Sequence, residues 1–141
     1  MCAHPFAYSK LVEDLKRAGL RPTRQRVILA KILFEQGARH ITAEQLHREV
    51  RDSSLRISLA TVYNSLNQFV EAGLLREIPG HGSQTFFDTR VEDHYHFILP
   101  DGKGLQDFSA DAVGFEKLPG IPEGAEIDKI EVTIHLKKKR A

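Results

Sequence analysis

Residues 57–75 read ISLATVYNSLNQFVEAGLL, and this stretch decides the fold. Its apolar positions recur at the spacing of one helical face, which predicts a helix that begins after Ser58 and ends at Gly73. The inner face of this helix consists of Leu59, Val62, Leu66 and Phe69. The opposite face carries small and polar side chains, namely Ala60, Thr61, Tyr63, Asn64, Asn67 and Gln68.

The outer face of this helix has no charged side chain between Arg56 and Glu71. A merely solvated face usually carries Lys and Glu. By contrast, Asn and Gln bond the adenine edge in the major groove, and a small residue or a tyrosine ring touches a thymine methyl. We therefore interpret this face as a reader of DNA bases, with Thr61, Tyr63, Asn64 and Asn67 as candidate contacts. The alternative is that Tyr63 packs against a neighbouring element.

Three helical segments precede this helix. Apolar spacing predicts the first over about residues 7–18. The second is expected to begin at its cap Thr23, to run to about Gln36 and to be buried nearly all round. The third begins at Thr42, because Gln45 three residues later completes a capping-box pattern.

A β-hairpin is expected after the four helices. Residues 74–78 and 84–88 predict two strands around the turn PGHGS, whose glycines either allow close approach to phosphates or form an ordinary tight turn. This order of elements is typical of a winged helix-turn-helix domain. Arg21, Arg24 and Arg26 are expected along its phosphate-facing edge, and Arg21 also suits a narrow minor groove.

The sequence changes character near residues 89–93. Strands are predicted at HYHFIL (94–99), at LQDF (105–108) and at IDKIEVTIHL (127–136), with a weak helix over about 110–118. We expect an α+β protein with an N-terminal winged helix-turn-helix domain (1–89) and a small α/β dimerisation domain (90–141). A unit of about 50 residues has little core of its own, so dimerisation is expected.

Charge and cysteine content narrow the function classes. The chain has 141 residues and a net charge of +1, which divides into +3 for residues 1–89 and −2 for residues 90–141. A basic front half indicates polyanion binding. No run of about 18 apolar residues is present, and the N-terminus lacks a signal-peptide core, so we expect a cytoplasmic protein without a membrane partner. The lone Cys2 excludes a disulfide within the chain and a four-cysteine zinc site.

A candidate metal site is indicated in the second half. His94 and His96 are one residue apart in a predicted strand, so both imidazoles lie on one face with Cα atoms about 6.5–7 Å apart. Asp88 at the end of the preceding strand, Asp107 in the partner strand and His40 before the third helix complete the set. A histidine and carboxylate mixture without sulfur suits Fe(II), Mn(II) or Zn(II). The alternative is that His40 and Asp107 are ordinary surface residues.

The segments AGLRPTRQR, RHITAEQL and ISLATVYNSLNQFVEAGLL resemble the ferric uptake regulator (Fur) family of metal-responsive bacterial repressors over about residues 10–108. Within that family, GLLREIPGHGSQTFFDT, DHYHFIL and the basic end IHLKKKR are most similar to the iron response regulator (Irr) branch. The resemblance implies a dimer that contacts DNA through Arg21, Tyr63 and Asn64, and the sequence leaves a tetramer open as the resting oligomer. It also implies a regulatory metal at the hinge between domains on His40, Asp88, His94, His96 and Asp107.

The chain departs from the family pattern at three points. The first cysteine pair of the family's structural zinc falls near Leu99 and Gly102, where no cysteine occurs, so that zinc is not expected. Asp93 and Tyr95 interrupt the usual histidine run. Irr-like proteins respond to haem, some through an N-terminal Cys-Pro, but here Ala3 follows Cys2. His94 and His96 are therefore the candidate haem ligands.

These features predict an iron-responsive transcription regulator that binds AT-rich pseudo-palindromic operators as a dimer and senses a metal or haem. One alternative is a repressor that senses Mn, Fe or Zn directly and does not respond to haem. A metal-dependent hydrolase is another, but no nucleophile paired with a base is evident, so we expect no enzyme. A DNA-binding protein without a sensor and a protein-interaction module are the remaining alternatives.

Overall fold

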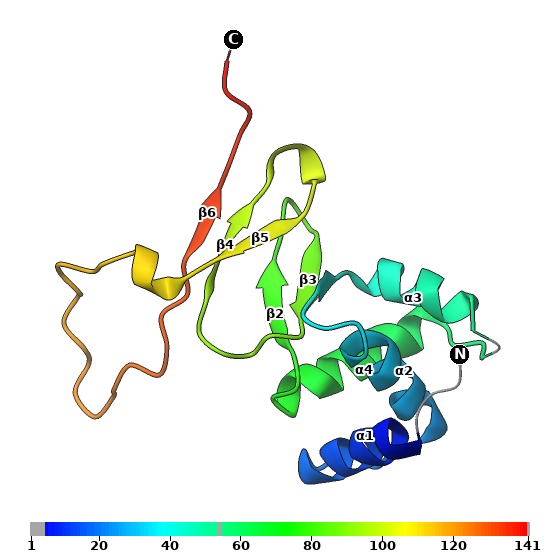
Figure 1. Ribbon diagram of the computed structural model, residues 1–141. Helices are drawn as coiled ribbons and strands as arrows, with labels where there is room; N and C mark the ends of the chain where they lie inside the picture. The colour runs from blue at the N-terminus through cyan, green and yellow to red at the C-terminus, as the bar shows by residue number, and fades with distance from the viewer. Residues whose placement is uncertain (1–4, 54, 141) are drawn as a thin grey trace. The chain divides into compact units, whose positions relative to one another are not determined.

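The computed structural model describes residues 5–53 and 55–140, and its elements fall into two compact units, Met1–Val91 and Glu92–Ala141 (Figure 1). Cys2, on which the cysteine argument rests, lies outside the described residues. Within the described ranges, no helix is both long enough and apolar enough to cross a membrane.

The first unit is a helical cluster followed by a small sheet (Figure 1). Its helices and strands, in chain order, are α1 (Pro5–Arg17), α2 (Arg24–Phe34), β1 (His40–Ile41), α3 (Ala43–Arg51), α4 (Leu59–Glu71), β2 (Arg76–Pro79) and β3 (Thr85–Asp88). The order agrees with the predicted helix-turn-helix and hairpin. The strand β1 is new: the sequence predicts only a loop at His40.

Side-chain caps begin three of these helices. The hydroxyl of Thr23 accepts from the Arg26 amide at 3.3 Å, that of Thr42 from the Gln45 amide at 3.1 Å, and that of Ser58 from the Thr61 amide at 3.1 Å. Each cap satisfies an amide that the helix itself leaves without a partner and contributes about 1 kcal/mol. The predicted starts of α2, α3 and α4 are confirmed by these bonds.

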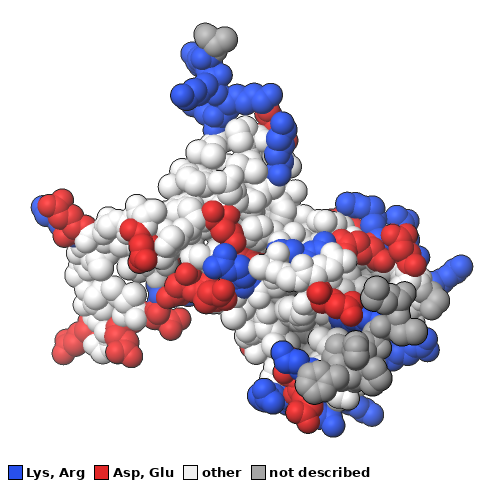
Figure 2. Space-filling view, in the orientation of Figure 1, with Lys and Arg blue, Asp and Glu red and all other residues white. Residues whose placement is uncertain are grey.

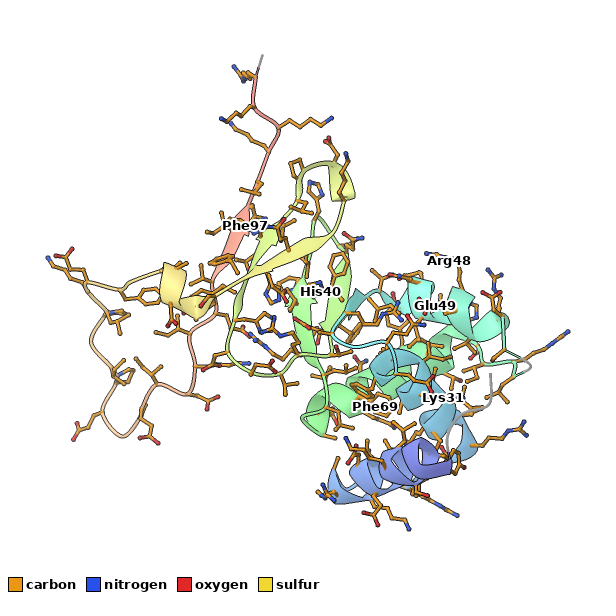
Figure 3. The ribbon with its side chains drawn as sticks, in the orientation of Figure 1. Lys31, His40, Arg48, Glu49, Phe69 and Phe97 are labelled. Carbon is orange, nitrogen blue, oxygen red and sulfur yellow. The ribbon has the colours of Figure 1, made fainter. Side chains whose placement is uncertain are left out.

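The core of the first unit lies where α1–α4 meet one face of the sheet. Its fully buried side chains include Leu29, Leu33, Leu46, Leu66 and Phe69, the last of which is labelled in Figure 3. The sequence predicts Leu59 on this inner face, but Leu59 is 37% exposed, because it occupies the first turn of α4, before the helix reaches the core. Ser65 takes a buried position instead.

The sheet of the first unit has the order β1-β3-β2, with both pairings antiparallel. In the β2–β3 hairpin, the amide of Gly80 donates to the Gln84 carbonyl at 2.7 Å. A Cβ on Gly80 would lie 2.7 Å from the Phe86 ring, so a glycine is needed there for steric reasons. His81, Gly82 and Ser83 at the tip are exposed.

The second unit contains a three-stranded sheet of order β5-β4-β6. Strands β4 (Tyr95–Ile98) and β5 (Leu105–Phe108) are antiparallel, and β6 (Thr133–His135) runs parallel to β4. Two single 3₁₀ turns complete the regular structure, at Pro100–Gly102 and Ala110–Ala112.

Two predictions for this unit are wrong. The expected helix over 110–118 is reduced to the turn Ala110–Ala112, because Gly114 and Pro119 disfavour a helix there. The strand expected over 127–136 is limited to β6. Its alternating apolar side chains are exposed in the single chain, since nothing in this unit covers them, at Ile130, Ile134 and Leu136.

Charge in the second unit is separated along the chain. Figure 2 shows the terminal Lys and Arg side chains as a blue cluster at the C-terminal end. Lys138 in this segment pairs with Asp101 at 3.0 Å, although both side chains are exposed. The long segment between β5 and β6 carries mostly acidic charges, among them Asp111, Glu116, Glu123, Glu126 and Asp128.

Candidate metal centre and nucleic-acid interface

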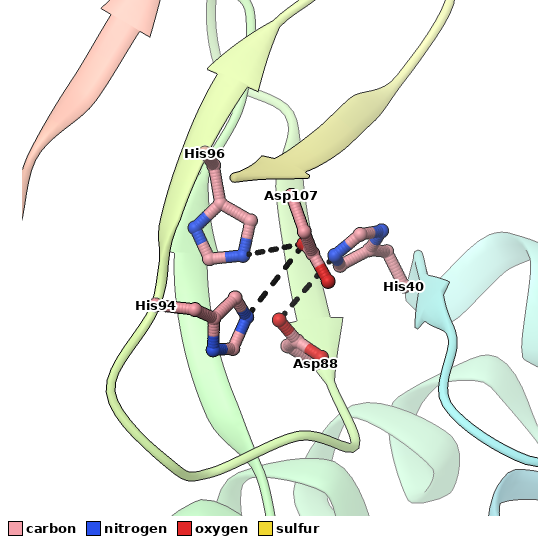
Figure 4. A group of neighbouring side chains, drawn as sticks. All are labelled: His40, Asp88, His94, His96 and Asp107. Atoms are coloured by element: carbon pink, nitrogen blue, oxygen red, sulfur yellow. Dashed lines mark ion pairs between the residues drawn. The ribbon is translucent and has the colours of Figure 1, made fainter. Parts of the chain in front are cut away.

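The first unit brings His40 and Asp88 together. They are opposite one another in the β1–β3 register, and the His40 Nε2 lies 3.3 Å from the Asp88 Oδ2 (Figure 4). Asp88 is fully buried, and its Oδ1 accepts from the Arg90 amide at 2.9 Å. That bond orients the carboxylate so that its second oxygen faces the imidazole. The pair therefore offers one nitrogen and one oxygen ligand in a fixed geometry.

The backbone around this pair is held from both sides. The Arg39 amide donates to the Thr89 hydroxyl at 3.0 Å, and the Thr89 amide donates to the Arg39 carbonyl at 3.1 Å. The guanidinium of Arg39 also makes a bidentate contact with Glu49 of α3, at 3.0 and 2.8 Å. Figure 3 labels both Glu49 and His40. These bonds fix the register of β1, which is why a two-residue strand suffices to position His40.

The second unit brings His94, His96 and Asp107 together. His96 is opposite Asp107 in the β4–β5 register, and the Asp107 Oδ1 lies 3.2 Å from the His96 Nε2 and 3.6 Å from the His94 Nε2 (Figure 4). The two imidazole centroids are 4.5 Å apart. Both histidines are buried, and Asp107 is partly exposed. His94 precedes the strand rather than lying within it.

The tautomer of His94 follows from one contact. Its Nδ1 lies 2.6 Å from the Glu92 carbonyl, and a carbonyl oxygen only accepts, so Nδ1 carries a proton. In the neutral ring, Nε2 then presents its lone pair toward the Asp107 carboxylate. A nitrogen lone pair and a carboxylate oxygen that face each other at this distance are the kind of donor atoms that bind a metal ion. A fixed Nδ1–H···O=C bond is the usual support of a metal-ligating histidine.

The two sets together supply three imidazoles and two carboxylates, each with one ligand atom. Nitrogen and hard oxygen donors without sulfur suit Fe(II), Mn(II) and Zn(II). The donor chemistry thus fits a divalent metal. His47, His81 and His135 belong to neither set.

The outer face of α4 is accessible, as the sequence predicts. Tyr63, Asn64 and Asn67 are exposed, and Thr61 is half-buried. The Thr61 hydroxyl accepts from the capping Ser58 hydroxyl at 2.9 Å, which ties it to the helix start. The described face carries no Lys, Arg, Asp or Glu of its own from Leu59 to Val70. The helix can therefore approach a base-pair edge without placing a charged side chain of its own against the bases.

Two hydrogen bonds to this face are not predicted by the sequence. The Tyr63 hydroxyl donates to the Glu44 carboxylate of α3 at 2.7 Å, and the Arg26 guanidinium of α2 donates to the Gln68 side-chain oxygen at 2.9 Å. Arg26 also donates to the Arg21 carbonyl at 2.9 Å. These partners are 19 and 42 residues apart along the chain, so no local spacing rule would find them.

The contact between Tyr63 and Glu44 changes the acidity of both groups. The hydrogen bond to Glu44 raises the pKa of the Tyr63 phenol, with further contributions from burial and from the negative charge of Glu44. The same hydrogen bond lowers the pKa of the Glu44 carboxyl, assisted by a backbone hydrogen bond and by the nearby Arg48, which Figure 3 labels. At neutral pH the pair is therefore a phenol donating to an ionised carboxylate.

Basic side chains flank α4 rather than lying on it. Arg21 is exposed just before α2. A groove of about 680 Å³ next to the start of α4 is lined by His47, Arg51, Ser53, Leu55, Arg56, Ile57 and Ser58. The two arginines and the helix start give this groove a preference for anions such as phosphates. The sequence does not predict this groove, whose lining residues come from α3 and from the segment that leads to the Ser58 cap of α4.

Comparisons with known proteins identify the family to which the chain belongs. The sequence profile of the ferric uptake regulator family matches residues 17–135. The ferric uptake regulation protein of Shigella flexneri is 37% identical over 100 residues, which cover 70% of this chain and 68% of that protein. That of Escherichia coli K12 is 36% identical over the same length and shares.

Solved structures of such regulators share the fold. The Vibrio cholerae ferric uptake regulator has a TM-score of 0.71 at 26% identity, covering 90% of this chain and 98% of that one. The Pseudomonas aeruginosa ferric uptake regulator, solved with manganese, has a TM-score of 0.69 at 25% identity, covering 91% and 97%. The α+β fold with an N-terminal helix-turn-helix is thus confirmed. Proteins of this family bind DNA, are generally dimers and are not enzymes. The chain belongs to the ferric uptake regulator family of metal-responsive, DNA-binding transcription regulators.

Proposed function

We propose that this protein is an iron-responsive regulator that binds AT-rich, pseudo-palindromic operators as a homodimer and works in the cytoplasm. The observation that carries this proposal is the exposed, uncharged face of α4. Tyr63, Asn64, Asn67 and Thr61 contact base edges in the major groove, and Arg21 contacts the sugar-phosphate backbone or the minor groove. In a dimer, two such helices reach two half-sites.

The two units have separate tasks in this proposal. Residues 1–89 form the DNA-binding domain, and residues 90–141 form the dimerisation and sensing domain. Support for dimerisation comes from the apolar side chains that the second unit leaves exposed, which are Phe115, Leu118, Ile121, Ile127, Ile130, Ile134 and Leu136. A partner that covered them would contribute roughly 25 cal/mol for each Å² of apolar surface removed from water.

A single divalent ion is held by His40 and Asp88 together with His94, His96 and Asp107. Neither set alone closes a coordination shell, because the first supplies two ligands and the second three. Only five residues separate Asp88 from His94, so the chain keeps their Cα atoms within about 21 Å of each other. Binding of one ion by both sets restricts the orientation of the two units. A difference of about 1–3 kcal/mol in metal affinity between DNA-competent and incompetent orientations is enough for a switch.

Haem is the second candidate signal. It is supported by the Irr-like segments of the sequence and by the close His94 and His96 imidazoles. Because both rings are only 3% exposed, haem ligation requires β4 and its neighbours to open. Direct metal sensing requires no such movement and is therefore the first choice.

The decisive experiment measures operator affinity without ligand, with Mn(II) and with haem. The full-length protein first selects its preferred duplex from a random pool. A change in affinity of about fivefold or more with Mn(II) alone supports direct metal sensing, whereas a change with haem alone supports the Irr-like alternative. If the protein selects no sequence from the pool, the proposed function is wrong.

A further inference from the structure

Tyr63, on the candidate base-reading face of α4, is hydrogen-bonded to a residue of another helix. Tyr63 is 37% exposed, and its hydroxyl donates to the Glu44 Oε1 at 2.7 Å. Glu44 lies in the first turn of α3 and is itself exposed. Both residues belong to the first unit, so the contact lies within one compact body.

A carboxylate at this position is costly for a DNA-binding surface. Its charge repels the phosphates that the flanking arginines attract, and a neutral side chain would avoid that cost. Glu44 does gain from the helix dipole at the start of α3, but this gain is small for an exposed first-turn carboxylate. The hydrogen bond to Tyr63 gives the carboxylate a second role, because a hydrogen bond to an ionised acceptor is roughly twice as strong as a neutral one.

The backbone position of Glu44 is fixed by its neighbours in the chain. Ile41 and Ala43, on either side of the capping residue, are buried at 0% and 1% exposure. Thr42 fixes the start of α3 through its bond to the Gln45 amide. The backbone that carries Glu44 is therefore pinned to the core, so the carboxylate limits where the Tyr63 hydroxyl lies.

We propose that Glu44 is a positioning residue that holds the Tyr63 ring in its base-reading orientation. This inference rests on the proposed function, since it assumes that Tyr63 contacts bases. With the hydroxyl committed to Glu44, the ring keeps one orientation before DNA arrives, and less side-chain entropy is lost on binding. The gain is confined to the cognate sequence, because only there does the ring meet its target. The negative charge of Glu44 weakens binding to every sequence equally.

The test compares variants on two duplexes, namely the one that the wild-type protein selects from a random pool and a scrambled duplex of the same composition. Glu44→Ala is expected to lower the ratio of the two affinities about fivefold, which is the loss of about 1 kcal/mol. Tyr63→Phe keeps the ring and removes the hydroxyl, so it should lower the ratio to a similar extent. The double variant should be no worse than either single variant, because both remove the same bond.

Two further variants separate positioning from charge and from folding. Glu44→Gln keeps an acceptor oxygen and should restore most of the ratio. Glu71→Gln removes one exposed carboxylate from the end of α4, away from Tyr63, and should leave the ratio unchanged. Far-ultraviolet circular dichroism is expected to be unaltered in all of them, since Glu44, Tyr63 and Glu71 are exposed.

The inference is wrong if Glu44→Ala raises the affinity for both duplexes equally and leaves their ratio intact, because Glu44 then only repels phosphates. It is also wrong if the effects of Glu44→Ala and Tyr63→Phe add up in the double variant. Failure of the proposed function gives a different result. In that case the wild-type protein selects no sequence, or Tyr63→Ala leaves the affinity ratio unchanged.

Discussion

His40 and Asp88 are opposite each other in the β1–β3 ladder, and the imidazole Nε2 lies 3.3 Å from the carboxylate Oδ2. The relationship joins the segment that leads into α3 to the end of the hairpin. Both residues are candidate metal ligands, and Asp88 is a buried carboxylate. The contribution of this pair to metal binding can be separated from that of the second set.

Replacing His40 by Ala tests whether both sets bind the same ion. We expect the Mn(II) affinity to fall at least tenfold, because one of five ligands is lost while His94, His96 and Asp107 remain. Isothermal titration calorimetry measures this directly. His47→Ala removes a histidine that belongs to neither set and should leave the affinity unchanged. An unaltered affinity in His40→Ala would mean that the second set binds metal alone.

Removing both His94 and His96 is expected to abolish the response of operator binding to metal or haem. Both nitrogen ligands of the second set disappear, leaving only the Asp107 carboxylate on that side. The measurement is operator affinity with and without Mn(II) or haem. Because both histidines are buried, His94→Gln with His96→Gln serves as a second variant of closer volume. A normal response in a folded double variant contradicts the proposed sensor.

Tyr63 and Arg21 are expected to affect DNA binding in different ways. Tyr63→Ala should weaken binding to the selected operator about tenfold, with the dimer intact and the slope of log affinity against log salt unchanged, because no phosphate contact is lost. Arg21→Ala should weaken binding to all sequences and reduce that slope by about one. Fluorescence anisotropy at several salt concentrations distinguishes the two. Equal effects of Tyr63→Ala on operator and scrambled duplexes would remove Tyr63 from base reading.

The hydrogen bond between Tyr63 and Glu44 predicts an altered titration. Since it raises the pKa of the Tyr63 phenol above its ordinary value of 10.0, it stabilises the fold below pH 10.0, and this contribution is lost as the pH rises through the raised pKa. The tyrosinate absorbance of Tyr63, taken as the difference between wild type and Tyr63→Phe, should therefore appear at a higher pH than that of an ordinary tyrosine. In Glu44→Ala it should return to the ordinary range. A wild-type titration at the ordinary value would contradict the contact.

The carboxyl partner titrates with the opposite sign. The pKa of Glu44 is lowered from 4.5, so its contribution to stability is present above pH 4.5 and is lost as the pH falls through the lowered pKa. Glu44→Gln should therefore flatten the acid limb of the unfolding free energy against pH. Urea unfolding between neutral pH and pH 3 measures this difference.

The hairpin turn offers a test of the fold. Gly80→Ala places a Cβ about 2.7 Å from the Phe86 ring and should destabilise the first unit by roughly 1–3 kcal/mol. Gly114→Ala is the matched control, since nothing lies within 4 Å of its Cβ position. Urea unfolding of both variants checks the difference. Equal stability would indicate that the hairpin shifts to accept the methyl group at no cost.

The sequence by itself determined the elements that depend on local rules. Thr23, Thr42 and Ser58 cap their helices because a hydroxyl reaches an amide three residues away, whatever the rest of the chain does. The uncharged face of α4 follows from helical periodicity in the same way. The strand LQDF, with Asp107 in it, was predicted in the same way, whereas the pairing of Asp107 with His96 came from the structure.

Tertiary structure alone decided the contacts between distant segments. His40 belongs to a two-residue strand because β3 pairs with it 48 positions later in the chain, and no periodicity shows in so short a strand. Glu44 reaches Tyr63, and Arg26 reaches Gln68, only because three helices pack on one core. The apolar alternation near Ile130 indicated burial, yet burial requires a surface to pack on, and the described residues of the second unit leave Ile130, Ile134 and Leu136 exposed. A few adjacent residues determine the local hydrogen bonds, whereas the partner of a side chain across the core depends on how all the elements pack.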